Sequence, residues 1–262
     1  QDATNHAQID WTLGSQSGKL PIADANGLTI NDSGPPDTIV LDNSNGNPLP
    51  NLLMLNGSFA INGALSIGAN QKVVLAHTAA ANSNQLSINS LNVPFPPGSG
   101  ASPGTLDLND GKLLIHYTGS SPLSLIQLYL ASGSANNYAI LSSDAKANPK
   151  FAIADTDSAD PLVTGQPQNT ILLSYALVGD LNLSHKVDFT DFVTLARNYN
   201  QTNADWAMGD FNYDGKVDFG DFVSLARNYN QTGPTVTAAF IPVVTSDVTA
   251  LKKHARRPLL QA

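Results

Sequence analysis

The chain has 262 residues, of which 42% are apolar, enough for one large hydrophobic core or two modest ones. The absence of cysteine excludes a disulfide framework and thiol chemistry. All 21 acidic residues are Asp, the net charge is −8, and four of the 13 basic residues lie between positions 252 and 257. The acidic remainder argues against nucleic-acid binding, and no apolar run approaches the roughly 18 residues that span a bilayer.

Short apolar runs separated by Gly, Asn and Asp extend from about residue 28 to residue 117. Many short strands at a spacing of roughly ten residues predict a mainly β domain, either a sandwich or a β-solenoid, and periodicity does not choose between the two. The predicted strands are Thr38–Leu41, Leu52–Leu55, Leu65–Ile67, Lys72–Ala76, Leu86–Ile88, Thr105–Leu108 and Leu113–Tyr117. The predicted turns are Asn45-Gly46, Asn56-Gly57, Asn62-Gly63 and Asp110-Gly111.

One helix is predicted after these strands. Ser121 is its expected N-cap, Pro122 suits its first position, and Leu123 to Leu130 supply its apolar face. Gly133 is the expected residue after its C-terminus. Further on, residues 171–178 (ILLSYALV) predict a buried strand that leads directly into Gly179, so the next segment is expected to dock closely on the β domain.

Residues 179–202 recur almost unchanged at 209–232, with an offset of 30 positions. The two copies are GDLNLSHKVDFTDFVTLARNYNQT and GDFNYDGKVDFGDFVSLARNYNQT, and a tandem duplication is the simplest explanation. Each copy predicts a loop that is followed by a short helix. In the second copy Phe222, Val223, Leu225 and Ala226 give that helix its apolar face.

The second copy has the oxygen-donor spacing of an EF-hand-like calcium loop. Alternate side chains at positions 1, 3 and 5 converge on one point, position 7 offers a backbone carbonyl, and position 12 closes the ligand shell from the helix. Gly215 at position 6 permits the sharp turn. The expected ligands are Asp210, Asn212, Asp214, Lys216 through its carbonyl, Asp218 and Asp221.

The first copy carries a weaker version of the same ligand set: Asp180, Asn182, Ser184, Lys186 through its carbonyl, Asp188 and Asp191. Ser184 places an uncharged oxygen at position 5, and His185 stands where Gly is usual, so it must adopt a left-handed conformation. We therefore predict two Ca²⁺ sites, of which the second loop binds more strongly. The alternative is an acidic helical hairpin without metal. It is disfavoured because like charges brought so close together oppose folding.

The repeated GD-N-DGKVDF-DF–LARNYN pattern resembles a type I dockerin, the two-loop calcium module of bacterial extracellular proteins. More narrowly, it is similar to the C-terminal modules of planctomycete-type secreted or cell-surface proteins. The upstream LDLNDGKLLIHYTGSSPLSLIQLYLASG is similar to the β-rich region that precedes the module in those proteins. The resemblance implies attachment between proteins outside the cell.

Dockerins of cellulosomes bind cohesins through loop positions 10 and 11, which often carry hydroxyl groups. Here those positions are Phe189 and Thr190 in one copy and Phe219 and Gly220 in the other. This departure argues against a cohesin-like receptor. The two Phe side chains are expected in the protein core, with contact to a neighbouring subunit as the alternative. Arg197 and Arg227 recur on what we expect to be solvated helix faces.

No catalytic constellation is present in the sequence: there is no G-x-S-x-G, H-E-x-x-H or P-loop motif. The five histidines lack ligand spacing, and His77 and His116, which end strands, are expected to be structural. The stretch from Asp107 to Asp110 is interpreted as a turn at a strand end rather than as a catalytic acid pair. The chain is therefore expected not to be an enzyme, with a secreted glycan hydrolase as a minor alternative.

The sequence divides into a β-rich domain (1–178), a calcium module (179–233) and an extended tail (234–262) that could donate a strand to a sheet edge. The basic end of the tail (KKHARR) is expected to be a solvated terminus, with a processing signal or a contact for an acidic neighbouring subunit as alternatives. The first residue, Gln1, fits a processed, exported chain. The whole predicts a non-catalytic structural protein in cell-surface or filament assembly, whose partners are other copies of itself or another extracellular protein. The alternative is an attachment module that carries a cargo or carbohydrate-binding β domain to a surface receptor.

Overall fold

The computed structural model describes residues 52–78, 80–93, 103–160, 162–163 and 165–234, and the backbone of four further strands between residues 8 and 40. Two of these four, β1 (Gln8–Leu13) and β2 (Gln16–Pro21), form a separate antiparallel pair. The six-stranded sheet runs in the order β12 (Phe151–Asp157), β13 (Thr170–Leu177), β10 (Lys112–His116), β8 (Gln85–Asn92), β6 (Ser58–Ser66) and β4 (Asp37–Val40). The five-stranded sheet runs in the order β11 (Ala139–Leu141), β9 (Thr105–Asp107), β7 (Lys72–Leu75), β5 (Leu52–Asn56) and β3 (Leu28–Asn31).

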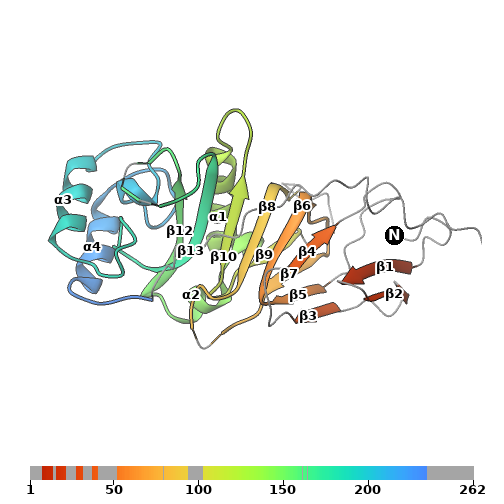
Figure 1. The fold of residues 1–262 in the computed structure, drawn as a ribbon. Coiled ribbons are helices and arrows are strands. Elements are labelled where there is room, and N and C mark those ends of the chain that lie inside the picture. The colour runs from red at the N-terminus through yellow and green to blue at the C-terminus, as the bar shows by residue number, and fades with distance from the viewer. Residues whose placement is uncertain are drawn as a thin grey trace, which may run out of the picture.

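Consecutive strands from β3 to β11 alternate between the two sheets, and their neighbours within each sheet are parallel. Each coil of the chain therefore contributes one strand to each of the two sheets. This winding is that of a two-sheet β-solenoid, one of the two alternatives that the sequence left open. Figure 1 shows β8, β6 and β4 in one layer and β7, β5 and β3 in the other. The described helices all follow β10 in the chain, so the chain as a whole contains both strands and helices.

The first hydrophobic core fills the space between the two sheets. Alternate positions of β5 point inward, as the burial of Leu53 and Leu55 shows. Further inward-facing residues come from both layers and include Phe59, Ile61, Leu75, Leu86, Ile88, Leu106 and Leu113. Asn62-Gly63, expected as a turn, lies instead within β6, where the pairing register with β8 shifts between Ile61 and Ala64. That expectation was wrong because an Asn-Gly pair also suits a β-bulge.

Helix α1 (Leu123–Asn136) connects β10 to β11, and its ends differ from the prediction. Pro122 is the N-cap, although the Ser121 hydroxyl still accepts a hydrogen bond from the Leu123 N–H. Gly133 lies inside the last turn, and the left-handed residue after the helix is Asn137 (φ +63°). The glycine serves close packing instead, because a Cβ there would lie 1.5 Å from the Ile140 carbonyl oxygen.

In the six-stranded sheet the parallel pairing ends at β10, which pairs with β13 in antiparallel orientation, as β13 does with β12. The short helix α2 (Ser143–Ala147) precedes β12. All eight residues of β13 are buried, as the sequence predicted for this strand. One face of β13 contributes Ile171 and Leu173 to the inter-sheet core, and the other contributes Leu172 and Ala176 to a second core.

That second core lies between the outer face of the six-stranded sheet and the C-terminal module. The module consists of α3 (Phe189–Asn198), a 3₁₀ turn η2 (Trp206–Met208), α4 (Phe219–Asn228) and the two loops before the helices. Its residues in this core include Leu181, Val187, Leu195, Trp206, Phe211, Val217 and Leu225. Figure 1 shows α3 and α4 at the end of the molecule beyond β12 and β13. The expectation of a closely docked module agrees with this shared core.

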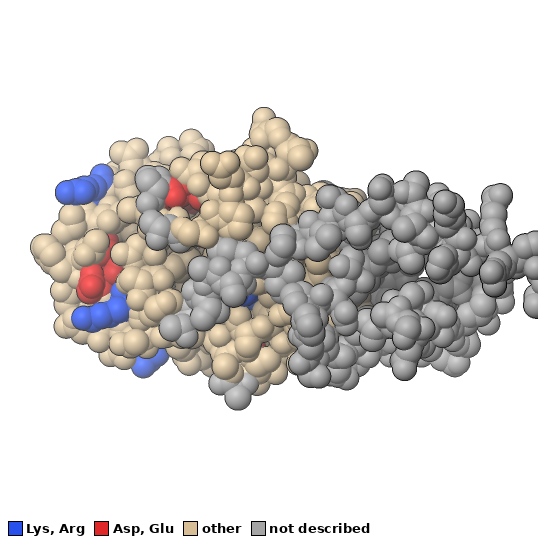
Figure 2. Space-filling view, in the orientation of Figure 1, with Lys and Arg blue, Asp and Glu red and all other residues tan. Residues whose placement is uncertain are grey.

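The predicted tail strand (residues 235–251), the basic end and the Asn45-Gly46 turn lie outside the described residues. Among the described helices, none has the length and apolar character needed to cross a membrane. In the view of Figure 2, charged side chains gather mainly over the module, and most of the other described surface is uncharged.

Candidate calcium module

The second loop turns sharply around the carboxylate of Asp210. Its Oδ1 accepts a hydrogen bond from the Asp214 N–H at 3.2 Å, and its Oδ2 accepts one from the Gly215 N–H at 2.8 Å. Asn212 Oδ1 shares the Asp214 N–H at 2.8 Å. Gly215 has φ +80°, a left-handed conformation that glycine adopts without steric cost. The side chains at positions 1 and 3 therefore curl around the same short stretch of backbone.

Asp221 at position 12 joins the beginning and the end of the second loop. Its Oδ1 accepts from the Phe211 N–H and its Oδ2 from the Asp218 N–H, both at 2.9 Å. Asp218 in turn accepts from the Gly220 N–H, so Asp218 and Asp221 form a capping box at the N-terminus of α4. The helix is thus started by two carboxylates that the sequence also assigned to the ligand set.

The first loop repeats this geometry. Asp180 accepts from the Ser184 and His185 N–H groups at 2.9 and 2.8 Å, and Asp191 accepts from the Leu181 and Asp188 N–H groups at 3.0 and 2.8 Å. His185 has φ +74°, so it takes up the left-handed conformation that its match to Gly215 required. The loops differ at position 5, where the Ser184 hydroxyl donates to the Lys186 carbonyl at 3.2 Å.

Four of the loop carboxylates are buried among other acidic groups. Burial, reinforced by the nearby Asp191 carboxylate, raises the pKa of Asp180 to about 7. Burial, together with Asp221 and Asp214, raises the pKa of Asp210 to about 6. Burial likewise raises the pKa of Asp191 and of Asp221. Carboxylates gathered in this way are stabilised by a cation, and their hard oxygen donors fit Ca²⁺.

Each loop forms hydrogen bonds with the residues that follow the helix of the other copy. Val187 of the first loop exchanges hydrogen bonds with Gln231 (3.1 Å) and Asn230 (2.8 Å), which follow α4. Val217 of the second loop bonds in the same way to Gln201 (3.1 Å) and Asn200 (2.8 Å), which follow α3. Each loop is therefore supported by the other half of the duplication.

Polar contacts join the module to the solenoid. The Tyr213 hydroxyl donates to the Ile153 carbonyl at 2.8 Å and accepts from the Ile153 N–H at 3.0 Å, which satisfies an edge position of β12. Asn228 Nδ2 donates to the carbonyls of Lys150 and Val178 at 3.1 and 2.8 Å. Sequence reasoning missed both residues, although Tyr213 replaces a Leu of the first copy.

Phe189 and Phe219, expected in the core, are 66% and 65% exposed, so that expectation was wrong. Position 10 is the first residue of each helix, and the helices fill the shared core with Leu195 and Leu225 instead. The two rings end an aromatic row that runs Phe189, Phe192, Phe222, Phe219, with successive ring centroids 6.0, 6.1 and 6.1 Å apart. We call these four residues the aromatic row. Arg197 and Arg227 lie on exposed helix faces, as predicted, whereas Ala226, expected on the apolar face of α4, is exposed.

A duplicated loop–helix unit with this donor pattern defines the class of two-loop, EF-hand-like calcium modules. Residues 178–237 match the family model of the type I dockerin domain, so the C-terminal part of the chain is a type I dockerin module. Such modules bind calcium, are not catalytic and attach one protein to another. No match was found among curated proteins or among solved structures.

Proposed function

We propose that the chain is a non-catalytic, extracellular structural protein in which the dockerin module attaches the β-solenoid to a protein partner. The supporting observation is the aromatic row, whose outer rings, about two-thirds exposed, are the most exposed large apolar side chains among the described residues. Exposed aromatic residues in one row are typical of protein–protein contact surfaces. The proposed division is a β-rich domain (1–178), the module (179–233) and a tail (234–262).

Calcium is proposed to hold this surface in shape. The second loop would bind Ca²⁺ more strongly than the first, because Asp214 adds a charge where Ser184 does not. In addition, the Ser184 hydroxyl occupies the Lys186 carbonyl that would face the ion. Because each loop begins the helix that carries one outer Phe, ion binding fixes the spacing of the two rings. The proposed ligands are Asp210, Asn212, Asp214, Lys216, Asp218 and Asp221, and Asp180, Asn182, Ser184, Lys186, Asp188 and Asp191.

The partner of first choice is another copy of the chain, which gives cell-surface or filament assembly. A solenoid is suited to this role because its stacked coils make a stiff spacer between contact surfaces. The second candidate is attachment to a different surface protein, with the solenoid as cargo or as a carbohydrate-binding domain. This second candidate is supported by the binding of dockerins to cohesins. It is disfavoured because Phe189 and Phe219 occupy positions where cohesin-binding dockerins often carry hydroxyls.

Particle size in calcium and in excess chelator tests the proposal. Light scattering and negative-stain microscopy of the full chain are expected to show oligomers or fibres in millimolar Ca²⁺ that dissolve on chelation, and Asp210→Ala should act like the chelator. A double variant, Phe189→Ala with Phe219→Ala, is expected to remain monomeric in calcium. The matched control is Leu125→Ala with Leu128→Ala, which removes two exposed apolar side chains from α1.

Three outcomes separate the alternatives. A chain that stays monomeric in calcium but is captured by a cohesin-type protein through the same two Phe residues favours attachment over self-assembly. Assembly that survives the double Phe substitution removes the aromatic row from the proposal. Hydrolysis of a glycan, lost when one Asp of the solenoid is changed, would support the minor enzyme alternative.

A further inference from the structure

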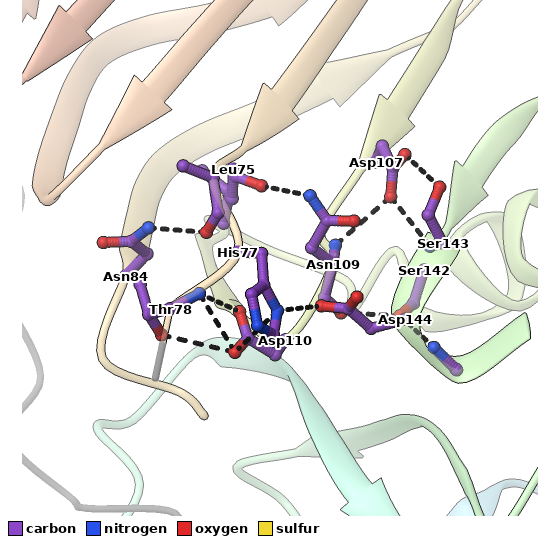
Figure 3. A network of polar contacts seen from close by, with 12 residues as sticks. Leu75, His77, Thr78, Asn84, Asp107, Asn109, Asp110, Ser142, Ser143 and Asp144 are labelled. Carbon is purple, nitrogen blue, oxygen red and sulfur yellow. Dashed lines mark hydrogen bonds and ion pairs between the residues drawn. The ribbon is translucent and has the colours of Figure 1, made fainter. Parts of the chain in front are cut away.

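A second cluster of ligand-type side chains lies in the solenoid, far in sequence from the calcium loops. His77 follows β7, Asp110 lies in the turn between β9 and β10, and Asp144 is in the first turn of α2. One ligand atom of each residue lies within 4.8 Å of the other two. Figure 3 shows the imidazole of His77 between the two carboxylates. His77 Nδ1 is 2.7 Å from Asp144 Oδ2 and 3.4 Å from Asp110 Oδ2.

The geometry points to a binding site for a divalent transition-metal ion of the zinc type, formed by His77 Nδ1 and the carboxylates of Asp110 and Asp144. Zinc bonds nitrogen and oxygen ligands at about 2.0–2.1 Å, which separates tetrahedral ligand atoms by roughly 3.3 Å. The two distances from Nδ1 to the carboxylate oxygens lie on either side of this value. Three protein ligands leave at least one coordination position for water. Imidazole disfavours calcium, so the site is chemically distinct from the module's loops.

The three ligands are held in place by their surroundings. Asn109 Nδ2 donates to the Leu75 carbonyl and Asn84 Nδ2 to the Ala76 carbonyl, both at 2.7 Å, and these bonds fix the chain just before His77. The Thr78 N–H reaches both oxygens of Asp110 at 3.1 and 3.2 Å. Figure 3 shows Asn84 and Thr78 to the left of the imidazole and Asn109 to its right. Such support from a second layer of hydrogen bonds is what a preformed metal site needs.

Asp107 helps to position Asp144, the third ligand. It accepts hydrogen bonds from the Ser143 N–H at 3.0 Å and from the Ser143 hydroxyl at 2.5 Å, which positions the first turn of α2 beside the β9–β10 turn. The Ser142 hydroxyl adds a bond to the Asn109 carbonyl at 2.5 Å. Asp144 is thereby brought to His77, 67 positions away in the sequence.

Within the part of the chain that the structure describes, the two carboxylates lack a permanent cation. Two lysines in the surrounding network are used elsewhere: Lys72 pairs with Asp107 at 2.9 Å, and Lys146 donates to the Gly133 carbonyl at 2.8 Å. Among the described residues, Asp110 and Asp144 form ion pairs only with His77. The Asp110 side chain is only 4% exposed.

The two carboxylates together carry a charge of −2, which one divalent ion bound with a neutral imidazole neutralises. Zinc takes deprotonated carboxylates and a neutral imidazole as ligands, so zinc binding should weaken as the solution becomes acidic.

Titration of the full chain with Zn²⁺, in saturating Ca²⁺ and near neutral pH, tests the site by calorimetry. The wild type is expected to bind one zinc ion, and Co²⁺ at the same site is expected to give a visible absorption band. His77→Ala should lower zinc affinity by at least the roughly 10–100-fold that even an outer-shell change costs. Because His77 is 67% exposed, this substitution is expected to leave the fold intact.

Asp144→Asn serves as the second variant, since Asn keeps a polar contact with His77 but offers a weaker ligand. The control is His116→Gln, which removes a histidine whose Nε2 contacts the Ser87 hydroxyl rather than the cluster. The proposal is overturned if the wild type takes up no zinc, or if zinc binding is unchanged in His77→Ala and therefore belongs to another histidine. These results leave the proposed function of the dockerin module untouched.

Discussion

Position 5 is the one proposed ligand position at which the two calcium loops differ in chemistry. The second copy has Asp214 and the first has Ser184, whereas positions 1, 3, 9 and 12 are identical. The backbone of both loops is the same in its left-handed turn and in its capping box. A difference in affinity between the loops should therefore come from ligand charge and not from loop shape.

Exchange of the two residues at position 5 should exchange the affinities. Ser184→Asp is expected to raise the calcium affinity of the first loop by about tenfold or more, and Asp214→Ser to lower that of the second loop similarly. Calorimetric titration of each variant measures the change. Ser120→Asp, which adds the same charge at an exposed position outside the module, is the control. Equal and tight binding by both wild-type loops would contradict the ranking.

The buried loop carboxylates also predict how pH acts on the metal-free protein. The pKa values of Asp180 (about 7) and Asp210 (about 6) lie above the ordinary 3.8, so the folded state holds protons that the unfolded chain has released. This stabilisation is complete below pH 3.8 and is lost as the pH rises through about 6 to 7. In chelator, the module should therefore melt at a lower temperature at pH 8 than at pH 5.

Calcium should reverse this pH dependence, because only deprotonated carboxylates bind the ion. Thermal unfolding followed by circular dichroism, at both pH values and with or without Ca²⁺, gives four midpoints. The midpoint in calcium should be higher at pH 8 than at pH 5. Midpoints in chelator that rise from pH 5 to pH 8 would show that the loop carboxylates are not the groups that set the stability of the module.

At the scale of elements, the duplicated helices have different tasks. α4 carries Asn228, which bonds to two carbonyls of the solenoid side, whereas its counterpart Asn198 in α3 bonds within the module to the Met208 carbonyl at 3.0 Å. Gly179 also packs closely against α4, because a Cβ at this position would lie 3.0 Å from the Leu225 Cα. α4 is thus the helix through which the module is fixed to the sheet.

Asn228→Ala should destabilise the docked module by about 1–3 kcal/mol, because it leaves two carbonyls without their donor. Asn198→Ala is the matched control and should cost less, since it removes one hydrogen bond. Urea unfolding in saturating calcium measures both free energies. An equal cost for the two variants would mean that the bonds from Asn228 to the solenoid add nothing beyond the helix's internal requirements.

For the molecule as a whole, the sequence predicted the module better than the domain that carries it. A repeat that places six oxygen donors at calcium-loop spacing constrains the chain tightly, and the left-handed turn at His185 and Gly215 followed from it. Sandwich and solenoid place apolar residues in the same alternation, so only the pairing of strands such as β6 with β8 separates them. Tyr213 and the cluster around His77 were hidden because each depends on contacts between segments distant in the chain.

The burial of β13 on both faces has a consequence for the order in which the protein can fold. Strands as far as β8 pair with a strand that precedes them in the chain. Among the described residues, by contrast, the second core on the outer face of β13 is formed mostly by residues that follow it, such as Trp206. The solenoid can therefore grow from its early coils, whereas its last sheet layer waits for the module. If the module needs calcium to fold, completion of the protein is timed by its arrival where calcium is plentiful, rather than by the end of synthesis.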